Sequence, residues 1–303
     1  MYDVVIIGAG PAGITAGIYA KRAMLNTVLV EKLGCGGQIA LTDVIENYPG
    51  FSRITGPELI QKFEEHVAGL GLEITYAEIE KIEDSGDVKI LHTTDGEKIS
   101  TRSVVIATGA HPSKLGVPGE TAYTGRGVSY CATCDGFFFT GKDVALVGGG
   151  GTAITEAIFL AKMVSRVYVI HRRDALRAEK ILQERAFKSP KIEFVWNSVV
   201  EEIKGRETVN TVVVKNVKTG KIQEIAVDGV FVFVGLKPNT DFIDCQKDER
   251  GFIKTDANLA TSMSGVFAAG DCRDKPLRQV VTAAGDGAIA SASVEKYLES
   301  MRH

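Results

Sequence analysis

Several features that mark specialised proteins are scarce in this 303-residue sequence. It has one tryptophan, and its five cysteines are an odd number that does not resemble the disulfide framework of a small secreted protein. No apolar run reaches the roughly 18 residues that a membrane-spanning helix requires. The 35 basic and 38 acidic residues nearly cancel, which leaves a net charge of -3 and no positive surplus for a polyanion. We therefore expect no membrane anchor and no nucleic-acid partner.

The rest of the composition is that of an ordinary soluble globular protein. Apolar residues make up 45% of the chain and charged residues 24%. The length is roughly twice the commonest domain size, so we expect two domains with separate cores. Met1 to Val4 run directly into a buried-strand pattern, without the basic segment and cleavage site of a secretory signal. The expected compartment is the cytoplasm.

The order of apolar and amphipathic segments predicts an α/β fold. Short runs rich in Val and Ile alternate with helical patterns, which is typical of parallel strands in βαβ units. These runs are Asp3 to Ile7, Thr27 to Val30, Ser103 to Ala107, Asp143 to Val147 and Arg166 to Ile170. Two further pairs of runs, each separated by a glycine-bearing turn, predict added hairpins at 88–92 with 98–100 and at 209–217 with 222–227.

An internal repeat connects the two halves of this pattern. The segment Gly8 to Thr15 aligns without a gap to Gly148 to Thr155, and each copy follows a predicted strand and opens a predicted helix. Glycines at such a turn let the backbone approach a pyrophosphate, whose charge meets the free N–H groups of the helix start. The sequence therefore predicts two Rossmann-like, three-layer nucleotide-binding domains. The residues expected at the two pyrophosphates are Gly8, Gly10, Pro11, Ala12 and Gly13, and Gly148, Gly150, Thr152 and Ala153.

The end of the second strand in the first repeat selects the nucleotide. Glu31 lies 23 residues after Gly8. An acid at this offset accepts hydrogen bonds from ribose hydroxyls and repels a 2′-phosphate. The first domain should therefore hold FAD or NAD.

The second repeat carries basic residues at the same offset. His171 lies 23 residues after Gly148 and is followed by Arg172 and Arg173, with Arg177 one helical turn further on. Guanidinium groups are suited to a 2′-phosphate, so this domain should hold NADPH rather than NADH. The alternative is a solvated basic face at a helix start, where cations oppose the helix dipole unless an anion is present.

The only closely spaced cysteines, Cys131 and Cys134, are separated by two residues. In a Cys-x-x-Cys motif one thiol attacks a disulfide and its neighbour resolves the mixed disulfide, which permits reversible two-electron transfer. Inert core cysteines and a metal half-site are the alternatives, but zinc would need a second ligand pair, and the isolated Cys245 and Cys272 do not supply one. Asp135, directly after the motif, is a candidate general acid, and an aspartate of a plain turn fits the spacing nearly as well.

A third candidate segment lies near the C-terminus. A short predicted strand ends in Gly270-Asp271 and is followed by Arg278-Gln279-Val280 and an apolar helix to about Ala292. The aspartate can hold a hydroxyl of a cofactor, and a helix N-terminus can face the negative charge of a reduced flavin.

At these residues the sequence closely resembles the low-molecular-weight thioredoxin reductases of bacteria, archaea and plants, over nearly its whole length. The resemblance implies an enzyme that uses NADPH, FAD and a Cys131–Cys134 disulfide to reduce its protein substrate, thioredoxin. It also implies the homodimer that is typical of the family. The matching segments are Gly8 to Gly13, 36–38, 47–50, 107–109, 131–135, 171–178, 235–240 and 270–280.

The resemblance further implies how the chain is divided. A discontinuous FAD domain would comprise residues 1–111 and 242–303, and an NADPH domain, residues 112–241, would carry the redox pair. Cys134 would face the flavin, Cys131 would attack thioredoxin and Asp135 would serve as the acid. The residues implied around FAD are Glu31, Lys32, Gly36, Gly37, Gln38, Asn47, Thr108, Gly109, Gly270, Asp271, Arg278, Gln279 and Val280.

This layout implies a motion. The redox pair and the nicotinamide share a domain and cannot both stack on the flavin at once. We therefore expect the middle domain to rotate about connections near His111 to Val117 and Gly235 to Thr240.

Some positions depart from the family pattern. Gly151 stands where Asn or Asp is usual and Thr155 where Glu is common, which can weaken contacts to NADPH. Cys35 is outside the family signature and is expected to be a small loop residue, with a regulatory thiol as the alternative.

Other functions also fit the motifs. A reductase of another disulfide, or one that takes electrons from ferredoxin, is the alternative enzyme, although the arginines argue against ferredoxin. A redox sensor or metal module without turnover is the alternative from another class.

Overall fold

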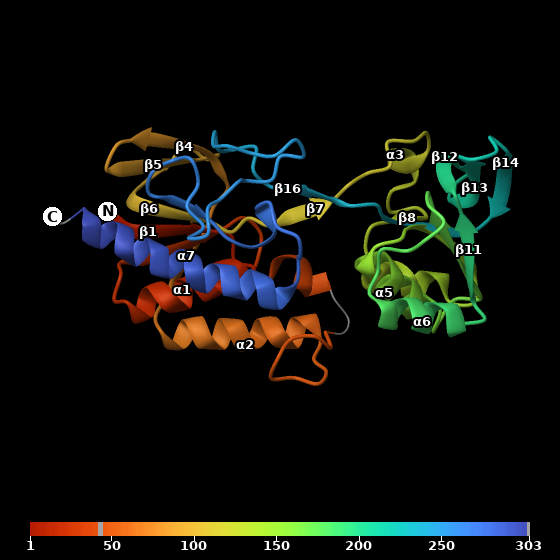
Figure 1. The fold of residues 1–303 in the computed structure, drawn as a ribbon, viewed down its shortest axis with the longest axis horizontal. Coiled ribbons are helices and arrows are strands. Elements are labelled where there is room, and N and C mark those ends of the chain that lie inside the picture. Colours follow the sequence, from red (N-terminus) through yellow and green to blue (C-terminus); the bar gives the residue numbers. More distant parts are fainter. Residues whose placement is uncertain (42–44, 302–303) are drawn as a thin grey trace. The chain divides into compact units, whose positions relative to one another are not determined.

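The computed structural model describes residues 1–41 and 45–301 (Figure 1). The chain forms two compact units. The terminal unit consists of Met1–His111 and the segment from Lys237 onward, and the middle unit consists of Pro112–Leu236. The chain crosses between the units twice, and the crossings pair as a two-stranded sheet of β7 (Ala110–Pro112) and β16 (Leu236–Pro238).

The terminal unit contains a seven-stranded sheet in the order β3-β2-β1-β6-β5-β4, with β17 paired to β6. Pairings among β1, β2, β3, β6 and β17 are parallel, whereas β4 and β5 form an antiparallel addition. The strands are β1 (Tyr2–Ile7), β2 (Thr27–Glu31), β3 (Glu73–Tyr76), β4 (Ile79–Ser85), β5 (Val88–Thr93), β6 (Lys98–Ile106) and β17 (Val266–Ala268).

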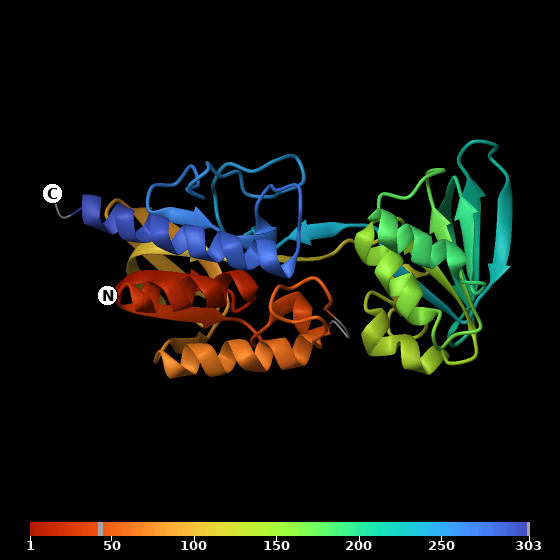
Figure 2. The ribbon, with the colours of Figure 1, turned by 60° about the horizontal axis from the view of Figure 1, so that its bottom comes forward.

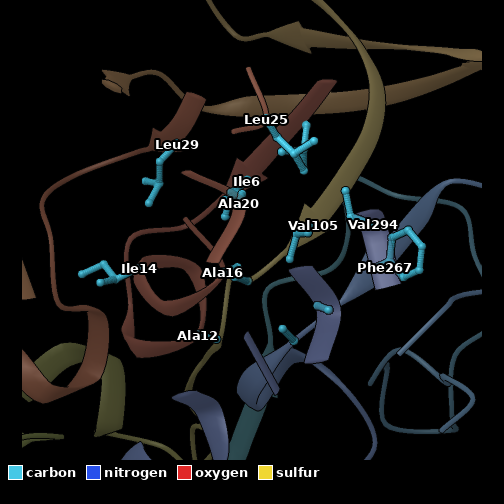
Figure 3. Close-up of a cluster of buried hydrophobic side chains, with 14 of the residues drawn as sticks. Ile6, Ala12, Ile14, Ala16, Ala20, Leu25, Leu29, Val105, Phe267 and Val294 are labelled. Carbon is cyan, nitrogen blue, oxygen red and sulfur yellow. The ribbon is translucent and has the colours of Figure 1, made fainter. Parts of the chain in front are cut away.

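Two long helices of the terminal unit pack closely because their contact surface is made of small residues. Helices α1 (Pro11–Arg22) and α7 (Val280–Ser300) lie side by side along the sheet (Figures 1 and 2). A Cβ at Gly287 of α7 would clash with the carbonyl oxygen of Ala12. Ile6, Leu29 and Phe267 are among the apolar side chains buried in the core that these helices share with the sheet (Figure 3).

Further elements complete the terminal unit. Helix α2 (Gly56–Gly69) begins with a capping box between Thr55 and Glu58, which satisfies free N–H groups of its first turn. The sheet also carries a second apolar cluster, to which Ile243 and Ile253 of the loop-rich segment before β17 contribute. Two short 3₁₀ turns, η1 (Gly37–Leu41) and η3 (Gly270–Cys272), lie in loops discussed below.

The middle unit contains a five-stranded parallel sheet in the order β11-β10-β9-β15-β8. One apolar cluster joins it to helices α5 (Gly151–Leu160) and α6 (Lys180–Lys188), and another joins it to a three-stranded antiparallel meander, so this unit has three layers. The strands are β8 (Val128–Ser129), β9 (Asp143–Gly148), β10 (Arg166–His171), β11 (Ile192–Trp196) and β15 (Gly229–Phe233), and in the meander β12 (Ser198–Gly205), β13 (Val209–Asn216) and β14 (Ile222–Ala226).

The predicted α/β architecture with two Rossmann-like units is confirmed. Four of the five predicted parallel strands agree with the structure within one residue at each end. The fifth is part of the longer β6, whose first residues also form the predicted hairpin with β5. Helix α7 extends to Ser300, beyond the expected end near Ala292. Among the described residues, no helix is both long and apolar enough to cross a bilayer.

Candidate active site

One edge of the terminal unit's sheet brings together residues that are far apart in the sequence. Strands β1, β2, β6 and β17 are parallel neighbours, so their carboxyl ends share this edge. Gly8, Glu31, Thr108 and Gly270 each lie at such an end or within two residues of it. Ligands of open α/β sheets bind outside the carboxyl ends of the strands. This edge is therefore the first candidate binding site.

The loop after β1 leaves the start of α1 accessible to a ligand. Gly8 has a φ of +104°, and a Cβ there would lie 2.5 Å from the carbonyl oxygen of Ala107. A Cβ at Gly13 would in turn clash with the carbonyl oxygen of Gly8. Gly10 is the N-cap and has no side-chain cap, and no described residue beyond its own chain neighbours has an atom within 4 Å of its Cβ position. Pro11 opens the helix. The uncapped N–H groups beside this open space fit a pyrophosphate.

Glu31 is held in place at the end of β2. Its Oε2 accepts a hydrogen bond from the backbone N–H of Ala9 at 2.7 Å, and its Oε1 accepts one from Leu33 at 2.9 Å. The acid is thereby fixed beside the glycine loop, where it suits a ribose with free hydroxyls. Lys32, expected at the cofactor, forms a salt bridge of 2.6 Å with Glu78 on the surface.

The loop that contains Gly36, Gly37 and Gln38 folds back onto the same edge. The N–H of Gly36 donates to the carbonyl of Ala9 at 2.8 Å, and Gln38 Nε2 donates to the carbonyl of Ala110 at 2.8 Å. Gly37 has a φ of +56°, and its Cβ position lies 3.7 Å from the Cα of Gly10. These contacts place the loop beside the first glycine turn, as a shared ligand would require.

Asn47 and Gln279 meet although they are separated by most of the chain. Asn47 Nδ2 donates to Gln279 Oε1 at 2.9 Å. Gln279 is the N-cap of α7 and forms a capping box with Thr282, so Val280 is the first residue of the helix. The pairing links the loop after η1 to the start of α7.

Asp271 and Arg278 carry buried polar atoms without a partner among the described residues. These atoms are Asp271 Oδ1 and Arg278 Nε. Burial raises the pKa of Asp271, against the opposing effects of Lys275 and Arg278. Burial likewise lowers the pKa of Arg278, whose guanidinium lies 4.0 Å above the ring of Phe252. Buried polar groups normally have partners, so an acceptor and a donor left open here fit a polar ligand such as the hydroxyls and carbonyls of FAD.

Asn239 is a residue of this edge that the sequence analysis did not select. Its backbone carbonyl accepts from Thr108 Oγ1 at 2.6 Å, and its Nδ2 donates to the carbonyl of Thr108 at 2.8 Å. Its N–H donates to the carbonyl of Gly109 at 3.0 Å, and its Oδ1 lies 2.6 Å from His111 Nδ1. Asn239 therefore holds the loop after β6. It lies in the segment 235–240, whose resemblance to the family was the one feature of the sequence that could have indicated it.

The middle unit has a second glycine turn at the carboxyl end of β9. Gly148 has a φ of +154°, and its Cβ position lies 2.7 Å from the Cβ of Ala153. Ala153 thus packs against the first glycine of the second turn, as Gly13 does against Gly8 in the first turn. Gly150 is an N-cap without a side-chain partner, and open space surrounds the Cβ positions of Gly150 and Gly151. Thr152 is exposed in the first turn of α5. This turn also fits a pyrophosphate.

His171 is buried at the end of β10 and does not project to the surface. Its ring packs on Gly149, where a Cβ would collide with it, and its Nε2 lies 3.1 Å from the carbonyl oxygen of Ala175. Burial is the main cause that lowers its pKa. His171 thus shapes the loop that carries the arginines.

Arg172, Arg173 and Arg177 are exposed in that loop, and no described carboxylate forms a salt bridge with them. The alternative interpretation, a solvated basic face at a helix start, does not hold, because α6 begins only at Lys180. Instead, the N–H of Arg177 donates to the carbonyl of Gly149 at 2.8 Å, which brings the loop back to the second glycine turn. Cationic side chains beside a phosphate-binding turn suit an additional phosphate.

Cys131 forms a disulfide, whereas Cys35, Cys245 and Cys272 are free. The side chain of Cys134 lies outside the described part of the structure. Helix α4 (Ala132–Asp135) carries the motif and is anchored by Ala132, which is fully buried in the cluster of helix α5. The N–H of Asp135 donates to the carbonyl of Cys131 at 3.2 Å, and Cys131 Sγ lies 3.3 Å from Thr133 Oγ1.

Two exposed aromatic residues follow the motif and were missed by the sequence analysis. Phe137 and Phe138 are 77% and 69% exposed in the 3₁₀ turn η2 (Gly136–Phe139). Their neighbour Phe139 packs inward against Phe231 with ring centroids 5.4 Å apart. In a sequence, three consecutive phenylalanines suggest a buried core segment. The structure shows that Phe137 and Phe138 are exposed and that Phe139 alone is buried.

Comparison with known proteins agrees with this geometry. Residues 2–287 match the family described as pyridine nucleotide-disulphide oxidoreductase. Thioredoxin reductase of Bacillus subtilis is 46% identical over 305 residues, covering 100% of this chain and 96% of that protein. The crystal structure of Lactococcus lactis thioredoxin reductase has a TM-score of 0.97 and 48% identity, covering 99% and 100% of the two chains. A ferredoxin-flavin thioredoxin reductase from Clostridium acetobutylicum has a TM-score of 0.55 and 31% identity, covering 99% and 98%.

The fold and the disulfide define the class: a pyridine nucleotide-disulphide oxidoreductase with two dinucleotide-binding units. Within that class, the chain belongs to the thioredoxin reductase family.

Proposed function

We propose that this protein reduces the disulfide of thioredoxin with NADPH, through FAD and a disulfide between Cys131 and Cys134. The observation that supports the proposal is the position of the Cys131 disulfide, immediately before a short helix packed against α5, the helix of the second glycine turn. A redox-active disulfide and a dinucleotide site thus share one unit. The relatives named above supply the substrate class.

The terminal unit would bind FAD. The uncapped turn at Gly10, the fixed acid Glu31 and the open polar atoms of Asp271 and Arg278 support this assignment. The proposed FAD domain, 1–111 and 242–303, differs from the structural unit only in residues 237–241, which pack with the terminal unit. Asn239 belongs to these residues and would support the loop at Thr108 that faces the cofactor.

The middle unit would bind NADPH. The turn at Gly148 to Gly150 would take the pyrophosphate, and the exposed Arg172, Arg173 and Arg177 would take the 2′-phosphate. The same arginines oppose ferredoxin as the electron donor, since a protein donor has no 2′-phosphate to bind.

The chemistry at the disulfide can be written with the chain's own residues. Bound FAD would supply the two electrons for the disulfide, with NADPH as their source. Reduction opens the Cys131–Cys134 disulfide, and the Cys131 thiolate attacks one sulfur of the thioredoxin disulfide to form a mixed disulfide. Cys134 attacks Cys131 in that mixed disulfide, which restores the protein's disulfide and releases the second thioredoxin thiolate. Asp135 would donate a proton to the leaving thiolate.

A rotation of the middle unit is part of the proposal. The arginines and Cys131 belong to the same unit, so both the nicotinamide and the disulfide must reach one flavin in turn. The expected hinge segments, His111 to Val117 and Gly235 to Thr240, overlap in part with the paired crossings β7 and β16. A crosslink between the units should block steady-state turnover, and full turnover with the crosslink in place would exclude the rotation.

The proposed function is tested by NADPH oxidation with oxidised thioredoxin, compared between the wild-type protein and Cys131→Ser. We expect turnover with the wild-type protein and none with the variant. If NADPH bleaches the flavin but thioredoxin is not reduced, the substrate is another disulfide. If reduced ferredoxin bleaches the flavin and NADPH does not, the proposed donor NADPH is wrong and the electron donor is ferredoxin.

The family resemblance also supports a homodimer located in the cytoplasm. Light scattering of the purified protein tests the dimer, and fractionation of the cells that produce it tests the location.

A further inference from the structure

Glu120 is a buried carboxylate of the middle unit that the proposed electron path does not use. Its side chain is held at the start of helix α3 (Glu120–Tyr123), and the residue is 1% exposed. Oε1 accepts hydrogen bonds from the N–H of Leu115 and the hydroxyl of Tyr130, both at 2.8 Å, and Oε2 accepts one from the N–H of Gly116 at 2.7 Å. No described cation forms a salt bridge with it. Buried polar oxygens are unfavourable without hydrogen-bond donors, so these three hydrogen bonds stabilise the side chain in its buried position.

The local sequence brings the carboxylate to this position. Gly119 has a φ of +87°, and a Cβ there would clash with the carbonyl oxygen of Ile203 on β12. The N–H of Ile203 donates to the carbonyl of Pro118 at 3.0 Å. The turn before α3 therefore lies directly on the meander, and only glycine permits this close approach.

The three donors come from two functionally distinct segments. Leu115 and Gly116 lie just beyond Pro112, where the chain enters the middle unit. Tyr130 immediately precedes Cys131, whose N–H donates to Ser129 Oγ at 3.0 Å. Burial, followed by the hydrogen bond to Glu120, raises the pKa of Tyr130 to about 12, so its hydroxyl remains a donor at neutral pH. One carboxylate thus connects the entry segment to the segment that leads into the redox motif.

We propose that Glu120 and Tyr130 are positioning residues for the redox disulfide. Their hydrogen bond fixes the backbone before Cys131, and a fixed backbone loses less conformational freedom when the disulfide closes. The pair thereby favours the disulfide over the dithiol. The inference deepens the proposed function, because it rests on Cys131 being redox-active.

The test compares Tyr130→Phe with Tyr123→Phe as a matched control. Both tyrosines pack against the same apolar cluster, and no hydrogen bond of the Tyr123 hydroxyl is described. The FAD-loaded proteins are equilibrated with mixtures of reduced and oxidised dithiothreitol, the thiols are alkylated, and labelled Cys131 is quantified by peptide mass spectrometry. We expect the ratio of dithiol to disulfide to rise about fivefold in Tyr130→Phe, the effect of one lost hydrogen bond. Tyr123→Phe should match the wild type.

A second variant and a second readout test the connection itself. Glu120→Gln should shift the equilibrium in the same direction, because an amide cannot accept all three hydrogen bonds. In Tyr130→Phe, amide hydrogen exchange at Leu115 and Gly116 should also become faster, since Glu120 is what links them to residue 130. Unchanged exchange there would contradict the link.

The result that overturns the proposal is a wild-type dithiol-to-disulfide ratio in folded Tyr130→Phe, whatever its melting temperature. A fall in melting temperature alone would mean that the hydrogen bond has only a structural role. The equilibrium needs neither NADPH nor thioredoxin, so it is measurable even if the protein fails to reduce thioredoxin. Failure of the proposed function and failure of this inference are therefore distinguishable.

Discussion

The ammonium of Lys275 lies 2.7 Å from Asp286 Oδ2, and both side chains are buried. The same oxygen accepts the N–H of Gly270 at 3.0 Å, and Arg273 approaches it at 3.4 Å. Asp286 lies on α7, so it ties the loop after β17 to that helix. Asp271, the next residue of this loop, is thereby held at the edge where the glycine turn of α1 begins.

Asp286→Asn should lower the stability of the protein strongly. Removing one partner of a buried ion pair leaves an uncompensated charge and costs about 3–5 kcal/mol. Denaturant unfolding monitored by circular dichroism measures the change. Asp241→Asn is the control, because Asp241 pairs with Lys237 on the surface, and it should leave the unfolding midpoint where it is.

Asp271→Asn should stabilise the FAD-free protein at neutral pH. Burial raises the pKa of Asp271 in the folded state, so the charged form is disfavoured there. The buried charge therefore destabilises the folded apoprotein. This destabilisation is complete above the folded pKa and disappears as the pH falls below the unfolded pKa of about 3.9. Melting temperatures of the apoprotein and the variant should therefore differ at pH 7 and converge in acid. The variant should also bind FAD more weakly, and equal affinity would remove Asp271 from the proposed site.

Arg172→Ala combined with Arg177→Ala should reduce the preference for NADPH over NADH. Each guanidinium would make charge-assisted hydrogen bonds to the 2′-phosphate, so the ratio of the two kcat/KM values should fall about tenfold or more. Flavin reduction kinetics with each nucleotide provide the measurement. Arg166→Ala removes an exposed arginine that pairs with Glu193 in the same unit and should not alter the ratio.

Phe137→Ala combined with Phe138→Ala should weaken the interaction with thioredoxin. Exposed aromatic side chains next to a reacting disulfide are suited to anchor a protein substrate, so KM for thioredoxin should rise about tenfold. Reduction of the flavin by NADPH should be unaffected. Phe187→Ala, at a phenylalanine that is 55% exposed elsewhere in the middle unit, is the control. An equal rise of KM in both variants would point to a general loss of folding.

Much of the architecture could be read from local patterns. Alternating apolar runs and helices predicted the parallel sheets, and the glycines at 8 and 148 marked both turns because their positive φ values favour glycine. The redox motif was also visible as a local pattern, because only two residues separate its cysteines in the sequence. The ligand-binding roles of these residues remain predictions.

Other parts of the candidate site depend on the path of the chain. No local pattern indicates that Lys32 pairs with Glu78, that His171 packs inward on Gly149, or that α6 starts after the arginines.

Local sequence patterns specify which segments are strands, helices and glycine turns, because backbone conformation and hydrophobic periodicity act over a few residues. The folded chain alone shows that Asn239 holds the loop at Thr108, that Asn47 contacts Gln279, and that Glu120 links Gly116 to Tyr130. These partners are chosen by where distant segments come together around a common core, and a polar side chain accepts whichever donor that packing leaves within reach.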